Sequence, residues 1–125
     1  MYELKVIARF AAAHQLKMVA KKCENLHGHN WKIEVCLAGK ALNSAGVLMD
    51  FGQFKNILSE IIKKLDHKFL NDLEYFSDSF PPSSENIANY IANELMASIN
   101  DPLVRVSSVT AWESENACAT YKPPA

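Results

Sequence analysis

The chain has 125 residues, with 13 basic and 14 acidic side chains and a formal net charge of -1. This length predicts one domain, residues 1–125, that can bury a core. The balanced charge lacks the basic field that nucleic acid requires, and no segment approaches the roughly 20 apolar residues of a membrane span. We therefore expect a soluble protein whose partner is a small molecule.

The N-terminus enters strand-like sequence at once, without the basic and apolar regions of a signal peptide, so we expect a cytoplasmic location. The cysteines are odd in number and widely spaced, at Cys23, Cys36 and Cys118. A disulfide framework is therefore not expected, and at least one thiol is free.

The first half of the chain predicts two strands. Residues 2–14 alternate at first between apolar and polar side chains, which indicates a strand with His14 on the same face as Phe10. Residues 15–25 are predicted to form a loop and residues 27–38 a second strand. Strands that are neighbours in sequence pair most simply as antiparallel partners, which would bring His14 to the start of the second strand.

Two of the four histidines, His27 and His29, are one residue apart, so a strand would project both from one face. With His14 they would offer three imidazoles to one metal ion. Three neutral imidazoles on zinc leave the open position of a catalytic site, although these ligands also suit neighbouring metals. Cys23, four residues before His27, could instead complete a closed structural site.

A first helix is predicted to begin after Asp50, because Gln53 three residues later completes a capping box, and to end near Leu65. Asp66 and His67 follow at its C-terminal edge. A carboxylate beside an imidazole suits a proton carrier. The alternative is a histidine stabilised by the helix dipole, beside an ordinary surface charge.

A second helix is predicted to begin after Ser83 or Ser84, either of which can cap it, and to end at Asp101-Pro102. A cap and a first-turn acid account for Ser83, Ser84 and Glu85. The exposed amides and the carboxylate at such a helix start would also make a polar ligand site.

Residues 103–113 and 117–121 are predicted to form the last two strands. Alternation places Val104, Val106 and Trp112 on one face of the longer strand and Val109, Ala111 and Glu113 on the other. The order β-β-α-α-β-β predicts an α+β fold with two helices on one face of a four-stranded antiparallel sheet. Its open edges would be covered by oligomerisation.

Six motifs, in this order and at these intervals, resemble the 6-pyruvoyltetrahydropterin synthase / 6-carboxytetrahydropterin synthase family over nearly the whole chain. They are Phe10-Ala11-Ala12-Ala13-His14, Cys23-x-x-x-His27-Gly28-His29, Val47-Leu48-Met49-Asp50-Phe51, Leu65-Asp66-His67-x-x-Leu70-Asn71, Ser83-Ser84-Glu85-Asn86-Ile87 and Trp112-Glu113-Ser114. The resemblance implies a tunnelling fold (T-fold), zinc on His14, His27 and His29, and a homohexamer with active sites between subunits. It also implies 7,8-dihydroneopterin triphosphate as the substrate.

The same resemblance implies roles for the other motif residues. Cys23 matches the catalytic thiol, Asp66 and His67 match a proton-relay pair, Glu113 matches the carboxylate that anchors the pterin ring, and the stretch 83–85 matches a substrate lining. A carboxylate such as Glu113 can accept two hydrogen bonds from a guanine-like edge.

The spacing from Cys23 to His27 looks like that of the bacterial 6-carboxytetrahydropterin synthases of the queuosine (7-deazaguanine) pathway. The 6-pyruvoyl enzymes tend to carry a longer insertion at this place. The 6-carboxytetrahydropterin synthases release triphosphate and acetaldehyde. Glu24 matches a possible alternative acid or base of relatives that serve folate synthesis by releasing 6-hydroxymethyl-7,8-dihydropterin, or it is an ordinary loop acid. Two non-enzymatic hypotheses remain, a structural zinc assembly module and a pterin- or purine-binding protein.

Overall fold

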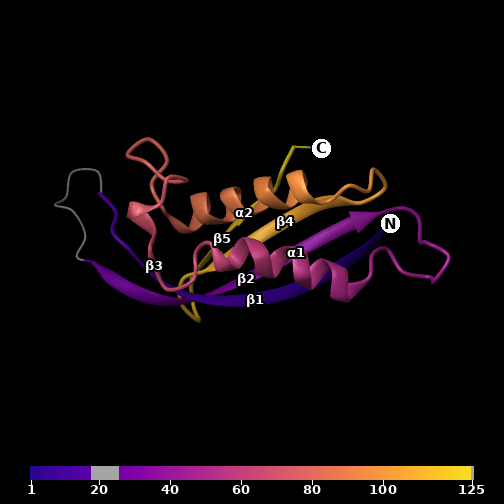
Figure 1. Cartoon of the computed structure of the whole chain (residues 1–125), viewed down its shortest axis with the longest axis horizontal. Coiled ribbons are helices and arrows are strands. Elements are labelled where there is room, and N and C mark those ends of the chain that lie inside the picture. The colour runs from indigo at the N-terminus through magenta and orange to yellow at the C-terminus, as the bar shows by residue number, and fades with distance from the viewer. Residues whose placement is uncertain (18–25, 125) are drawn as a thin grey trace.

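The fold is built on a sheet of five strands in the order β3-β1-β2-β4-β5. The computed structural model describes residues 1–17 and 26–124, apart from the side chain of His27. Its strands are β1 (Tyr2–His14), β2 (His27–Gly39), β3 (Lys68–Phe69), β4 (Arg105–Trp112) and β5 (Cys118–Tyr121). β1, β2, β4 and β5 pair antiparallel in that order, so β1 and β2 form the long centre of the sheet (Figure 1).

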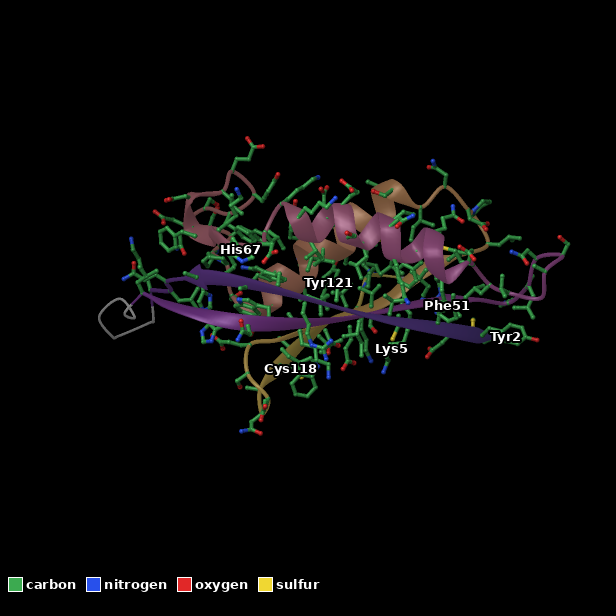
Figure 2. The ribbon with its side chains drawn as sticks, turned by 60° about the horizontal axis from the view of Figure 1, so that its bottom comes forward. Tyr2, Lys5, Phe51, His67, Cys118 and Tyr121 are labelled. Atoms are coloured by element: carbon green, nitrogen blue, oxygen red, sulfur yellow. The ribbon has the colours of Figure 1, made fainter. Side chains whose placement is uncertain are left out.

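Both helices, α1 (Phe51–Lys63) and α2 (Ser84–Ser98), lie on the same side of the sheet (Figures 1 and 2). The predicted caps are present: the Asp50 carboxylate accepts a hydrogen bond from the Gln53 amide, and the Ser83 hydroxyl accepts one from the Asn86 amide. The predicted α+β tunnelling fold and the order of its main elements are confirmed. Neither α1 nor α2 has the length and hydrophobicity that crossing a membrane requires.

The core lies between the helices and the inner face of the sheet. Alternate residues of β1 and β2 face this core, as predicted. Fully buried side chains from sheet and helices meet there, among them Trp31, Ile33, Val35, Phe54, Leu58, Ile87 and Ile91. The opposite face of the sheet carries polar side chains such as Lys5, on the side away from the helices (Figure 2). His14 shares the buried face with Phe10 and is 0% exposed.

The prediction of four strands, all antiparallel, was wrong because a short fifth strand, β3, pairs parallel with β1. After α1, the Asp66 carboxylate accepts a hydrogen bond from the Ala11 amide at 3.0 Å, and the His67 amide donates to the Ala11 carbonyl at 2.6 Å. His67 turns the chain with a left-handed φ of 59°. The edge of β1 thereby gains partners for its backbone groups, which an open edge lacks. The 3-10 helix η1 (Leu70–Asp72) follows directly.

The predicted faces of β4 were also partly wrong. The pairing register passes from Cys36↔Ser108 to Leu37↔Val106, so β4 contains a bulge at Ser107. An extra residue reverses the alternation on one side of a bulge. Val106 is therefore buried on the same side as Val109.

Candidate metal centre and substrate site

His14 is the buried anchor of the candidate site. It ends β1, and its Nδ1 atom lies 2.7 Å from the backbone carbonyl oxygen of Pro82, just before α2. A carbonyl oxygen only accepts hydrogen bonds, so Nδ1 carries the proton and donates it. In the neutral imidazole, Nε2 then carries the lone pair, which is the form in which histidine binds a metal.

His29 and Glu113 complete a cluster with His14. The Oε1 atom of Glu113 lies 3.0 Å from Nε2 of His14 and 3.0 Å from Nε2 of His29. One ligand atom from each of the three residues lies within 4.8 Å of the others. The side chain of His14 is 1% exposed, that of His29 21% and that of Glu113 32%. The cluster is thus enclosed on the His14 side and reachable from the Glu113 side.

Trp31 holds the two imidazoles in place. Its ring is fully buried and meets the rings of His14 and His29 edge-on, at centroid distances of 5.2 Å and 5.5 Å. His14 and His29 also meet each other edge-on at 5.1 Å. This role of Trp31 was not predicted from the sequence, although Trp31 follows His29 by two residues and so faces the same side of β2.

The cluster has the composition of a metal site. Imidazole nitrogen and carboxylate oxygen are both ordinary zinc ligands. A backbone carbonyl that accepts the second ring N–H of a ligating histidine is the usual means of orienting it, and Pro82 does this for His14. The residues present therefore fit a zinc ion or a similar divalent metal, and the donor set alone does not choose between them.

Three residues predicted at this site have side chains that the structure does not describe. Cys23 and Glu24 lie in the segment 18–25, so neither the catalytic thiol nor the rival closed site is tested. The backbone of His27 pairs with His14 across the two central strands, but its side chain is not described. Of the three predicted imidazoles, the structure brings His14 and His29 together.

Asp66 and His67 form a second, separate pair. The Nδ1 atom of His67 lies 3.0 Å from Oδ1 of Asp66, and the His67 side chain is 82% exposed. The hydrogen bond from the Ala11 amide, followed by the charge and the hydrogen bonds of His67, lowers the pKa of the Asp66 carboxyl. Among the described residues, neither belongs to the cluster of His14, His29 and Glu113. The Asp66 carboxyl is thus ionised, and the pair faces outward.

The stretch 83–85 lies beside the cluster through its chain neighbour Pro82. The Ser83 hydroxyl caps α2 by accepting from the Asn86 amide at 3.1 Å, which accounts for its main polar contact. Ser84 is half-buried and Glu85 is exposed in the first turn. A substrate lining is therefore compatible with Ser84 and Glu85, while Ser83 already has a structural role.

A cavity of about 570 Å³ adjoins the cluster at Glu113. Arg9 and Lys32 contribute positive charge to its lining, and Trp112 contributes a flat apolar surface over which the Lys32 ammonium lies, 5.5 Å from the ring centroid. Such a lining suits a ligand with both a hydrogen-bonding ring edge and negative charge.

A helix-covered sheet of this topology, with a partly buried histidine–carboxylate cluster at the end of its central strands, defines the class as a T-fold protein with a candidate metal site. Sequence comparison then identifies the family. A model of the family described as 6-pyruvoyl tetrahydropterin synthase matches residues 3–124. The chain belongs to this family.

Individual relatives carry different names. The chain is 42% identical over 86 residues to an Archaeoglobus fulgidus protein provisionally named 6-carboxy-5,6,7,8-tetrahydropterin synthase, covering 69% of each chain. It is 33% identical over 106 residues to the dihydroneopterin monophosphate aldolase of Pyrococcus furiosus, covering 85% of this chain and 84% of that protein. The structure of Caenorhabditis elegans 6-pyruvoyl tetrahydropterin synthase matches with a TM-score of 0.84 and 26% identity, covering 98% of this chain and 96% of that one. Family membership thus leaves several pterin reactions to choose from.

Proposed function

We propose that the chain is a zinc-dependent 6-carboxy-5,6,7,8-tetrahydropterin synthase. It would convert 7,8-dihydroneopterin triphosphate into 6-carboxytetrahydropterin, triphosphate and acetaldehyde, in the queuosine (7-deazaguanine) pathway of the cytoplasm. The observation that carries this function is the meeting of His14, His29 and Glu113 at one partly buried corner of a T-fold sheet. The relative from Archaeoglobus fulgidus, named for the same reaction, supports the choice of product.

In this function His14 and His29, with His27, hold the zinc ion. When bound, the metal supplies Lewis acidity toward hydroxyl groups of the substrate side chain. Cys23 removes a carbon-bound proton as its thiolate, a form that nearby positive charge favours. Glu113 accepts two hydrogen bonds from the amino and NH groups of the pterin ring and so selects its guanine-like edge.

Asp66 and His67 carry the second proton, and they come from a second copy of the chain in a homohexamer. Two observations support an intersubunit site. The His67 side chain is 82% exposed, and neither residue lies in the cluster of its own chain as far as that chain is described. An exposed relay pair becomes useful when another subunit brings its metal site to it. The stretch 83–85, next to Pro82, lines the bound substrate.

Product analysis tests this function. Purified, zinc-loaded protein is incubated with 7,8-dihydroneopterin triphosphate, and the pterin and small products are identified by mass spectrometry. Acetaldehyde with 6-carboxytetrahydropterin is the expected result. No turnover by the zinc-loaded hexamer would overturn the proposal.

One alternative has an observation of its own. The Pyrococcus furiosus relative is named for an aldolase acting on dihydroneopterin monophosphate, and Glu24 matches the acid of the folate-branch relatives. An enzyme of that branch would release 6-hydroxymethyl-7,8-dihydropterin. The same assay, repeated with the monophosphate, separates the two, because the folate branch leaves a glycolaldehyde phosphate in place of acetaldehyde. A 6-pyruvoyl product would retain the whole carbon side chain.

A further inference from the structure

The contact of Glu113 with both imidazoles has the geometry of a metal-ligand cluster. The Pro82 carbonyl places a proton of His14 on Nδ1, so in the neutral imidazole Nε2 presents its lone pair to the carboxylate oxygen 3.0 Å away. Two lone pairs at this distance repel unless a proton or a metal ion lies between them. The same oxygen lies 3.0 Å from Nε2 of His29, so a single ion at this point would serve all three atoms.

The two distances from Glu113 to the imidazole nitrogens are close to the spacing of metal ligands. Bonds of about 2.0–2.2 Å around a tetrahedral zinc ion separate neighbouring ligand atoms by roughly 3.3 Å. The Oε1 atom of Glu113 is 3.0 Å from both imidazole nitrogens, within a few tenths of an ångström of that value. Small side-chain adjustments would therefore admit an ion among His14, His29 and Glu113.

Glu113 is also placed where it can leave the cluster. It follows the last residue of β4, and residues 114–116 form an exposed turn after it. Its side chain is 32% exposed and lines the cavity that contains Arg9 and Lys32. A rotation of this side chain would carry the carboxylate from the imidazoles into the cavity without moving the strand.

We infer that Glu113 is a metal ligand in the substrate-free protein and leaves the metal when a pterin ring binds. The second half of this inference rests on the proposed function, in which both oxygens of Glu113 bind the ring edge. A carboxylate paired twice with the ring cannot also ligate the metal in this geometry. Its departure opens a coordination position only once the ring is in place. Glu113 thus links recognition of the ring to access to the metal.

The metal-ligand role is tested without substrate. Zn²⁺ affinity is measured by chelator competition, and the visible spectrum is recorded after loading with Co²⁺, for wild type, Glu113→Gln and the matched control Glu115→Gln. Glu113→Gln should bind Zn²⁺ at least about tenfold more weakly, which is the low end of the loss in metal affinity when a group that supports a metal site is removed. Its Co²⁺ bands should also differ from those of wild type. Glu115→Gln should match wild type. Wild-type affinity and an unchanged spectrum in Glu113→Gln would overturn the ligand assignment.

The displacement is tested on the wild-type protein with 7,8-dihydropterin, whose ring has no side-chain hydroxyl to reach the metal. Ring binding is followed by calorimetry, and the Co²⁺ bands should change when the ring binds. This ligand has no side chain that could supply a new metal ligand. Ring binding with unchanged bands would overturn the displacement. If the ring does not bind while Glu113→Gln still loses metal affinity, the ligand assignment stands and both the displacement and the proposed function fall.

Discussion

The Nδ1 atom of His14 lies 2.7 Å from the carbonyl oxygen of Pro82, a residue 68 positions later in the chain. This hydrogen bond joins the end of β1 to the segment that leads into α2. It fixes which nitrogen of His14 faces Glu113 and His29, and a ligand histidine depends on such a bond for its tautomer and orientation. The candidate metal site is therefore built by tertiary packing around residues that are far apart in sequence.

Replacing His14 with alanine should abolish tight metal binding. The change removes a ligand atom from the cluster and leaves the buried Pro82 carbonyl without its partner, which costs about 1–3 kcal/mol of stability. Zinc affinity by chelator competition and urea denaturation of the metal-free protein measure the two effects separately. His67→Ala is the matched control, because that imidazole is exposed and outside the cluster. Equal zinc affinity in the two variants would contradict the site.

Replacing Trp31 with alanine should destabilise the protein by about 3–5 kcal/mol, the cost of removing a large buried ring. Trp31 is 0% exposed and stacks on Phe10 at 6.0 Å, besides meeting both imidazoles of the cluster. Zinc affinity should fall as well, because His14 and His29 lose their common support. Trp112→Ala, on the other face of the sheet and half-buried, should cost less and leave zinc affinity intact. A comparable loss of stability in both variants, measured in urea, would count against this account.

Local patterns predicted the parts of the fold that depend on local physics. Alternation along β1 placed His14 on the buried face, and the capping residues Asp50 and Ser83 marked where both helices begin. β3 was missed because two residues carry no periodicity, and its partner is an edge that only the folded sheet presents. The bulge at Ser107 was missed because a serine within a strand does not indicate that the strand contains an extra residue.

The candidate site was predicted in part for the same reason. His14 and His29 follow from strand parity, since β1 and β2 are neighbours in sequence. The approach of Glu113 depends on β4 pairing with the far side of β2, a choice that no local pattern reveals. The Pro82 carbonyl is a backbone group, so no side chain at that position signals its role. The roles predicted for Cys23 and Glu24 stay predictions.

The stability of the protein in acid should depend on Asp66. The Ala11 amide, and after it His67, lowers the pKa of this carboxyl in the folded state. Just below the unfolded pKa of about 3.9, the unfolded chain therefore binds more protons than the folded chain. The stabilisation is complete above that pH and is lost as the pH falls through the lower, folded pKa.

Urea denaturation across this acid range, with NMR titration of the carboxyl, measures the effect of Asp66. Asp66→Asn should remove this part of the pH dependence. His67→Ala should keep most of it, because the Ala11 amide is the larger cause. A normal carboxyl titration at Asp66 in the wild-type protein would show that the hydrogen bond to β1 does not form in solution.

Replacing Cys23 with alanine should separate a catalytic thiol from a structural one. If Cys23 is the base of the proposed reaction, the variant should keep wild-type zinc content and oligomeric state but lose turnover by about 10²–10⁴-fold, the usual contribution of a general base. A closed site of one cysteine and three histidines would instead lose metal affinity and assembly in the variant, because its sulfur is a permanent ligand at about 2.3 Å. Cys36→Ala and Cys118→Ala, at the two free cysteines among the described residues, are the controls and should leave zinc content, assembly and turnover unchanged. Zinc analysis, light scattering and the product assay on the same preparations distinguish the two roles. A protein that keeps its metal and its activity without Cys23 would fit neither role.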